Sequence, residues 1–150
     1  MAEQPLMEMV TFPSDPARFR GIRDWLTEVA RKEGFDERQA LDVAVAVNEA
    51  CANIHLHAYA GREDGEIELR LEVQKEALSL RIRDYGSRFS PEKCRLPDLC
   101  NPSESGYGVF LIRALMDEVE YIRKEAGTEL LLRKHRRSGC GGWKGDGYVR

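Results

Sequence analysis

Alternation of apolar and charged side chains in the middle of the chain gives the clearest structural prediction. Residues 66–73 alternate strictly, and residues 78–82 alternate again after a short polar turn at 74–76. This period of two is typical of strands with one covered and one wet face, so we expect a β-hairpin. Two later apolar runs, 119–122 and 129–133, predict a second hairpin.

Helical periodicity frames these strands. Apolar residues that recur every three or four positions predict one helix that runs to about Lys32 and stops at Gly34. Asp36 can cap a second helix that runs to about Ala58. A third apolar run, 109–116, also indicates a helix.

The order of these elements predicts the fold class. With a short β-like segment at 10–12, the order is β, α, α, β, β, loop, α, β, β. Paired strands and paired helices favour an α+β fold: a two-layer sandwich whose mixed, mostly antiparallel sheet is covered on one face by helices. Residues 86–105 lack periodicity and predict a long loop, and the Gly-rich residues 135–150 predict a flexible tail.

Composition narrows the class of protein. The 150 residues are 42% apolar and 33% charged, which suits one domain with a packed core. Lys and Arg total 23 against 26 Asp and Glu, so the net charge of −3 argues against a protein that coats nucleic acid. The apolar stretches are shorter than a bilayer span and the first residues do not resemble a signal peptide. We therefore expect a cytoplasmic protein with no membrane contact.

The cysteines predict no disulfide framework. In a cytoplasmic protein Cys51, Cys94, Cys100 and Cys140 are expected to be thiols. Cys51 and His55 lie one helical turn apart and form the best metal-like pair. The second half of a four-ligand zinc site is missing, so buried or incidental thiols are the better interpretation.

The end of the second predicted helix carries candidate chemistry. Glu49, Asn53 and His57 follow one another at intervals of four, so they share one side of the helix beside its apolar stripe. The amide oxygen of Asn53 suits Mg²⁺, and Glu49 could deprotonate an attacking hydroxyl. The alternative is a solvated polar edge on a core helix, which the spacing alone favours.

Two further features follow along the chain. Asp84 ends a predicted strand and Gly86 allows a sharp turn, so the carboxylate could accept a hydrogen bond from an exocyclic amine. Gly106 and Gly108 precede a helix, where exposed N–H groups can bind phosphate. Taken singly, the first is better explained as a turn that closes a strand, and the second is a weak signal that a glycine-rich helix entry also explains.

Together and in this order, the three features resemble the N-box and the two glycine boxes of the GHKL ATPase superfamily, which has the Bergerat, or histidine kinase-like ATPase, fold. The pattern is most similar to the small bacterial anti-sigma-factor serine/threonine kinases. The resemblance covers residues 6–134, includes the stretch 106–121, and extends to a late Gly127-Thr128 pair. The family's N-box, E-A-x-x-N-x-x-x-H-x-Y, matches Glu49, Ala50, Asn53, His57 and Tyr59.

The resemblance implies roles at the phosphate end of an ATP site. Asn53 would coordinate Mg²⁺ that bridges the ATP phosphates. Glu49 would be the catalytic base acting on the acceptor serine. Gly106 and Gly108 would contact phosphates.

At the adenine end, the resemblance implies that Asp84 accepts a hydrogen bond from the amino group. Gly86 would give the base room, Thr128 would assist directly or through water, and residues 90–105 would form a lid. One position departs from the usual first glycine box, because Arg88 stands where a second glycine is common.

The function implied is that of an anti-sigma factor and ATP-dependent serine kinase that phosphorylates a STAS-type anti-sigma antagonist in a partner-switching system. The implied partners are a sigma factor and this antagonist, with no direct nucleic-acid contact, and family members commonly form homodimers. The alternative is a nucleotide-binding, catalytically weak regulatory module that sequesters a protein partner. The presence of both Glu49 and Asn53 favours the enzyme.

Overall fold

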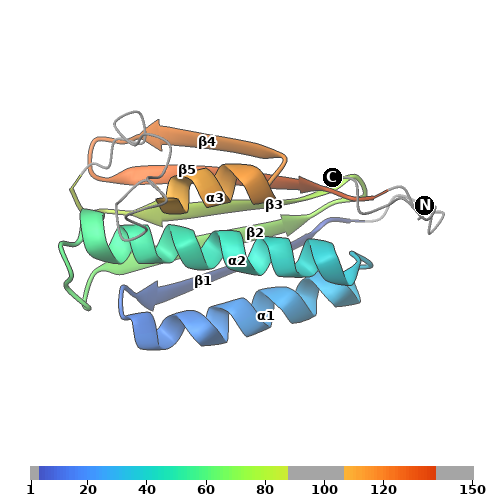
Figure 1. Ribbon diagram of the computed structural model, residues 1–150, viewed down its shortest axis with the longest axis horizontal. Helices are drawn as coiled ribbons and strands as arrows, with labels where there is room; N and C mark the ends of the chain where they lie inside the picture. Colours follow the sequence, from blue (N-terminus) through green and yellow to red (C-terminus); the bar gives the residue numbers. More distant parts are fainter. Residues whose placement is uncertain (1–3, 88–106, 138–150) are drawn as a thin grey trace.

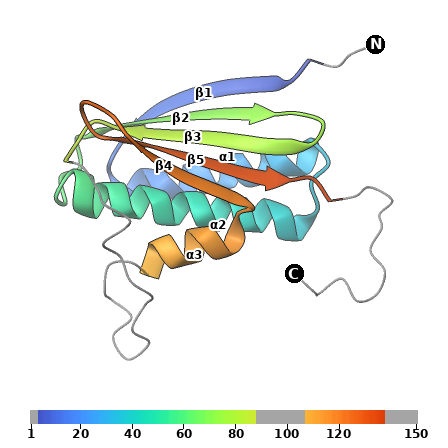
Figure 2. The same ribbon diagram turned by 90° about the horizontal axis from the view of Figure 1, so that it is seen from above.

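Helices cover one face of a five-stranded sheet in the computed structural model, which describes residues 4–87 and 107–137 (Figures 1 and 2). The strands are β1 (Leu6–Pro13), β2 (Glu66–Val73), β3 (Ala77–Asp84), β4 (Glu118–Arg123) and β5 (Thr128–His135). The helices are α1 (Phe19–Lys32), α2 (Glu37–Asn53) and α3 (Tyr107–Leu115), with a 3₁₀ turn η1 (Pro16–Arg18) before α1 and a π-helical turn η2 (Ile54–Ala58) after α2. The predicted α+β two-layer architecture is confirmed.

The sheet order is β1-β2-β3-β5-β4, and every neighbouring pair of these strands is antiparallel. The expectation of a mixed sheet was therefore wrong. Between β3 and β5 the chain passes through α3 and the edge strand β4, and it returns in the direction opposite to β3. The consequence is that Asp84 at the end of β3 faces Thr128 at the start of β5.

Helix α2 has a strong start and an unusual end. The Asp36 carboxylate accepts from the N–H of Gln39, and the Gln39 side chain accepts from the N–H of Asp36, which forms a capping box. The helix continues to Ala58 as expected, but its last turn, Ile54–Ala58, is π-helical. Such a turn is frequent at functional sites, and here it begins directly after Asn53.

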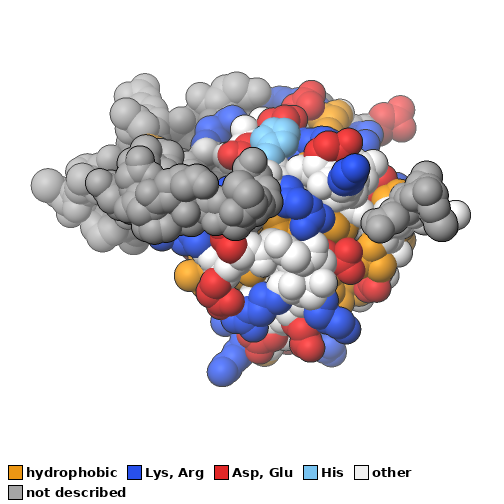
Figure 3. Space-filling view, turned by 90° about the vertical axis from the view of Figure 1, so that its right-hand side faces the viewer, with side chains coloured by type: hydrophobic (Ala, Val, Ile, Leu, Met, Phe, Trp, Pro, Cys, Tyr) orange, Lys and Arg blue, Asp and Glu red, His pale blue; other side chains and the backbone are white. Residues whose placement is uncertain are grey.

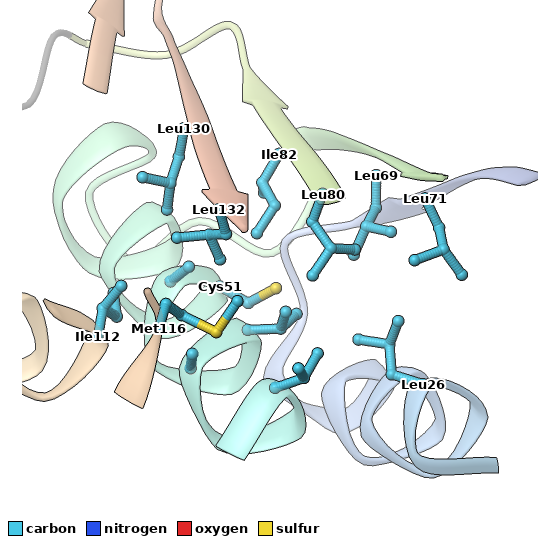
Figure 4. Packing of buried hydrophobic residues seen from close by; sticks show 14 of the residues in the cluster. Leu26, Cys51, Leu69, Leu71, Leu80, Ile82, Ile112, Met116, Leu130 and Leu132 are labelled. Carbon is cyan, nitrogen blue, oxygen red and sulfur yellow. The ribbon is translucent and has the colours of Figure 1, made fainter. Parts of the chain in front are cut away.

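The core lies between the helices and the inward face of the sheet (Figure 4). The residues predicted to face inward from the first hairpin are buried, and leucines of β5 and side chains of the helices pack against them. These buried residues include Leu26, Cys51, Leu69, Leu71, Leu80, Ile82, Ile112, Leu130 and Leu132.

Helix α3 is held to the sheet by a buried charge. Lys134 on β5 donates to Asp42 of α2 at 3.1 Å and to the carbonyl oxygen of Leu115 at 2.6 Å. Leu115 ends α3, where a positive charge is favoured by the helix dipole. Lys134 thus connects the end of α3 to α2, through one bond to a nearby residue and one that joins residues 92 positions apart.

The surface charge is mixed on the end of the molecule shown in Figure 3, where acidic and basic side chains are interspersed. Among the described side chains visible there, Lys and Arg do not gather into a concentrated basic patch, in line with the near-neutral composition. None of the helices within residues 4–87 and 107–137 has the length and apolar character needed to cross a bilayer.

Strand β5 and its contacts continue beyond residue 134. His135 is still in β5, and Arg136 stacks on the Phe35 ring with its guanidinium carbon 4.3 Å from the ring centroid. The same guanidinium donates at 2.6–3.2 Å to the backbone carbonyls of Glu33, Gln74 and Lys75. The packed chain thus extends to Arg137, and residues 138–150 lie outside the described part.

Replacing Arg136 with alanine is expected to lower the free energy of unfolding by about 2 kcal/mol, because three hydrogen bonds and a cation–π contact are lost. Arg137→Ala is the matched control, since Arg137 makes an ion pair with Asp36 near the surface and should contribute less than about 0.5 kcal/mol. Urea unfolding of both variants measures the difference. Equal losses would contradict the assignment of Arg136 to the folded domain.

Candidate functional site

A pocket lies where α2 ends above β3 and β5. Its wall is mostly apolar, and polar side chains come from the helix on one side and from the strand ends on the other. The lining residues are Ala50, Asn53, Ile54, Ala58, Ile82, Asp84, Tyr121, Thr128 and Leu130. A mostly apolar wall with a few convergent polar groups is typical of sites for flat organic ligands.

Asp84 and Thr128 form the polar end of the pocket on the sheet. Asp84 is only 3% exposed, and this burial raises the pKa of its carboxyl, while hydrogen bonds from the N–H groups of Gly86 and Thr128 oppose the rise. The Gly86 N–H donates to Oδ1 at 3.0 Å, which holds the carboxylate in one orientation. The buried Oγ1 of Thr128 has no hydrogen-bond partner among the described residues. A buried polar atom of this kind is able to bond to a ligand or an ordered water.

Asn53 and Glu49 lie on the helix side. The buried Nδ2 of Asn53 also lacks a partner among the residues that the structure describes. Glu49, one turn earlier, is half-buried, and this burial raises the pKa of its carboxyl. A carboxylate whose pKa is moved toward neutral is a better proton acceptor at physiological pH.

Gly108 brings α3 onto this pair. A Cβ atom at position 108 would lie 3.0 Å from Glu49 Oε1 and 3.3 Å from both amide atoms of Asn53. The missing side chain therefore lets the first turn of α3 approach these two residues. The N-terminal end of a helix favours negative charge, so this side of the site suits phosphate groups.

Two other glycines allow close approach at the sheet end. A Cβ at Gly86 would lie 2.2 Å from the carbonyl oxygen of Ala58, so the segment after β3 packs directly on the end of α2. Gly127 has φ +80°, and a Cβ there would lie 2.0 Å from the carbonyl oxygen of Asp84. Gly127 was expected as part of the late Gly127-Thr128 pair, and the structure places it directly against the backbone of Asp84.

The structure brings together most of the predicted site residues. Asn53, Asp84 and Thr128 line one pocket, and Gly86 supports Asp84. Glu49 does not line the pocket, but Gly108 lies against both Glu49 and the pocket residue Asn53. Three predicted parts of the site lie outside the described residues and stay predictions: Gly106, Arg88 and the lid at 90–105.

Sequence reasoning missed the apolar wall. Ile82 was predicted to face inward by alternation and Leu130 was placed only in the apolar run of a second hairpin, and nothing in the pattern indicated that the two line a pocket. Tyr121 on β4 was given no role, and its position in the pocket follows from the strand order. Tyr59 was noted only as part of the N-box.

The described residues contain no group of three or more His, Cys, Asp or Glu side chains that could hold a metal ion. A metal at Asn53 would therefore need ligands from elsewhere, as Mg²⁺ takes them from phosphates and water. Cys51 is buried, which raises the pKa of its thiol to about 12, so the thiol stays protonated. His55 directs Nδ1 to the carbonyl oxygen of Ser14 at 2.8 Å. The remaining cysteines lie outside the described residues.

Comparison with known proteins extends this picture. The family of histidine kinase-like ATPase domains matches residues 12–134. A protein of Oceanobacillus iheyensis named serine-protein kinase RsbW is 33% identical over 131 residues, which cover 82% of this chain and 82% of the relative. The protein of the same name from Bacillus pumilus is 34% identical over 141 residues, covering 86% and 85%.

A solved structure agrees on the fold. The crystal structure of the RsbU and RsbW domains of Rv1364c from Mycobacterium tuberculosis superimposes with a TM-score of 0.64 at 20% identity. The match covers 91% of this chain and 34% of that chain. The family match over most of the chain, the relatives above 30% identity and the geometry of the pocket agree, and we conclude that this chain belongs to the histidine kinase-like ATPase domain family.

Proposed function

We propose that this protein is an anti-sigma factor and ATP-dependent serine kinase that phosphorylates a STAS-domain antagonist in a partner-switching system. The observation that carries the proposal is the contact of Gly108 with Glu49 and Asn53. Asn53 in turn shares one pocket with Asp84 and Thr128. The proposed proton acceptor, the proposed metal ligand and the two residues proposed to recognise adenine would thus belong to one site. The relatives named serine-protein kinases support the same conclusion.

At the sheet end, the chain would bind the adenine ring. The Gly86 N–H donates to one carboxylate oxygen of Asp84, and the carboxylate keeps further lone pairs that can accept from the exocyclic amine. The free hydroxyl of Thr128 would supply a second hydrogen bond, directly or through water. Ile82 and Leu130 would contact the flat faces of the ring.

At the helix end, the residues fit a phosphate–metal group. The carboxamide of Asn53 faces the start of α3, its amide nitrogen is unpartnered, and its oxygen is a suitable Mg²⁺ ligand. Mg²⁺, when bound, would neutralise charge on the phosphates during transfer. The phosphates would bind to backbone N–H groups at the N-terminal end of α3, with Gly106 and Gly108 as the proposed contacts.

Glu49 would act as the base. The serine hydroxyl oxygen of the antagonist attacks the γ-phosphorus, the bond between that phosphorus and the bridging oxygen of ADP breaks, and the serine proton passes to the Glu49 carboxylate. Burial raises the pKa of this carboxyl, so transfer should fail on the acid side as Glu49 becomes protonated. In-line transfer needs positioning and charge stabilisation more than covalent chemistry. The proposed residues would supply the positioning and the charge stabilisation.

The partners follow from the proposed cycle. The protein would hold a sigma factor inactive until the unphosphorylated STAS antagonist displaces it, and phosphorylation of the antagonist would reverse the exchange. We propose that this cycle takes place in the cytoplasm and that the protein works there as a homodimer without direct contact to nucleic acid.

The proposal is tested by incubating the protein with Mg²⁺, [γ-³²P]ATP and STAS proteins from the same genome. We expect label on a serine of one antagonist, and release of a co-purified sigma factor when that antagonist is added unphosphorylated. Tight ADP binding with no transfer to any STAS protein would support the catalytically weak regulatory module instead. Failure to bind adenine nucleotides at millimolar concentration would overturn both functions.

Asn53→Ala should weaken Mg²⁺-dependent ADP binding about 100-fold, because the variant removes the metal's protein ligand. Asn48→Ala is the matched control on the same helix, since Asn48 bonds to Arg23 of α1 at 2.7 Å instead of facing the pocket. Calorimetric titrations with and without Mg²⁺ separate the two variants. An affinity in Asn53→Ala equal to that of the unchanged protein would remove the ligand role of Asn53.

A further inference from the structure

Tyr59 occupies an unusual position between two strands. Its ring is 6% exposed, its hydroxyl donates to the carbonyl oxygen of Glu66 at 2.6 Å, and the same hydroxyl accepts from the N–H of Tyr85 at 2.8 Å. Ile67 and Asp84 are the last pair at this end of the β2–β3 ladder. If the ladder continued by one residue, Glu66 would pair with Tyr85. The hydroxyl of Tyr59 therefore bridges two backbone groups that would otherwise bond to each other directly.

The ring of Tyr59 is fixed between two glycines. A Cβ at Gly65 would lie 2.4 Å from the ring carbons, and a Cβ at Gly86 would lie 3.0 Å from ring atom Cδ1. The N–H of Ser87 donates to the carbonyl oxygen of Ala58 at 2.8 Å. The segment that follows β3 is thus attached to the end of α2 through Tyr59, Gly86 and Ser87.

This attachment sets the geometry of the pocket. Asp84 immediately precedes the Tyr85 N–H that Tyr59 holds, and Asn53 lies on the helix that ends at Tyr59. We infer that Tyr59 is a positioning residue that holds the base-recognising carboxylate of Asp84 at a set place relative to the phosphate end of the site. This inference rests on the proposed nucleotide-binding function and adds a residue that determines selectivity for adenine.

Loss of the hydroxyl has a specific structural consequence. A phenylalanine at position 59 would remove the hydroxyl that the Tyr85 N–H and the Glu66 carbonyl share. The simplest repair is a direct hydrogen bond between these two groups, which would draw Tyr85 toward β2 and turn Asp84 with it. Burial raises the pKa of the Tyr59 hydroxyl, so it remains protonated and able to donate at neutral pH.

The test compares ADP with inosine diphosphate, which carries an oxygen in place of the amine that Asp84 would recognise. We expect the unchanged protein to prefer ADP by about tenfold or more, because an unpaired polar group in the site discriminates strongly. In Tyr59→Phe, ADP binding should weaken about tenfold while inosine diphosphate binding stays nearly constant, so the preference should largely disappear. A merely structural role would instead weaken both nucleotides equally or lower only the melting temperature.

Tyr85→Phe is the matched control. It removes a hydroxyl from the same segment, but this side chain is 42% exposed and stacks on Arg83 at 4.3 Å. The ADP preference should survive in this variant. If Tyr59→Phe does not fold, Gly65→Ala is the second variant, because its new Cβ displaces the ring of Tyr59 while the hydroxyl is kept. This variant should also reduce the preference for ADP over inosine diphosphate.

The outcomes separate the inference from the function. An unchanged protein that binds neither nucleotide overturns the proposed function and the inference with it. An unchanged protein that prefers ADP, together with a Tyr59→Phe variant of equal preference, overturns only the role of Tyr59.

Discussion

Glu49→Gln is expected to reduce phosphoryl transfer by about 10²–10⁴-fold, because a positioned base contributes on this scale and glutamine cannot accept the serine proton. ADP affinity should stay within about tenfold of the unchanged protein, since Glu49 is not among the residues that line the pocket. Transfer of label to the antagonist and calorimetric titration with ADP measure the two effects. A variant that retained full transfer would remove Glu49 from the mechanism.

The same substitution should stabilise the fold. Burial raises the pKa of Glu49 above its value in the unfolded chain, so the folded state binds this proton more readily. The charged carboxylate therefore destabilises the folded protein at neutral pH, and this effect disappears as the pH falls below the unfolded pKa. The glutamine side chain carries no charge, and because position 49 is half exposed we expect a modest rise of about 1–3 °C in melting temperature.

Glu37→Gln is the control on the same helix. The hydrogen bond and charge of Arg31 lower the pKa of Glu37, so its carboxylate is favoured in the folded state. This variant should keep full transfer and show no rise in melting temperature. A rise in both variants would mean that the effect of Glu49→Gln comes from reduced net charge rather than from local burial.

Gly127→Ala is expected to lower the free energy of unfolding by about 3–4 kcal/mol. The residue has φ +80°, which disfavours any side chain, and the new Cβ would lie 2.0 Å from the Asp84 carbonyl oxygen. Relief of this overlap requires β3 and the β4–β5 turn to move apart. Because Asp84 would shift as well, ADP affinity should fall in the fraction that remains folded.

Gly61→Ala isolates the packing effect from the backbone effect. Gly61 has φ +83°, almost the same as Gly127, but nothing lies within 4 Å of a Cβ there. We expect a loss of about 1 kcal/mol, which reflects the backbone conformation alone. Urea unfolding compares the two variants. Equal losses would show that the contact of Gly127 with Asp84 does not constrain the site.

The local pattern of apolar and polar residues was enough to predict most helices and strands. The alternation of 66–73 shows which side chains face the helices, and the capping residue Asp36 marks the start of α2. The first strand was predicted only at 10–12, whereas β1 spans Leu6–Pro13. At this edge of the sheet most outward side chains are exposed, and backbone pairing with β2 forms the strand without an apolar pattern.

The tertiary contacts that position the site residues could not be predicted from the local sequence pattern. Three contacts join distant parts of the chain. Lys134 bonds to Asp42, Gly127 packs against the backbone of Asp84, and the Tyr59 hydroxyl accepts a hydrogen bond from Tyr85. Spacing places Glu49 and Asn53 on one helical face, but it cannot show that Gly108 faces them. Only the tertiary arrangement distinguishes a polar helix edge from a binding site.

The most direct test of the central claim is a crystal structure with Mg²⁺ and a non-hydrolysable ATP analogue. We predict that the adenine amine will lie within hydrogen-bond distance of the Asp84 carboxylate. The metal should contact the amide oxygen of Asn53, with the γ-phosphate facing Glu49. A nucleotide bound elsewhere, or one whose base and phosphates do not bridge Asp84 and Asn53, would contradict the account.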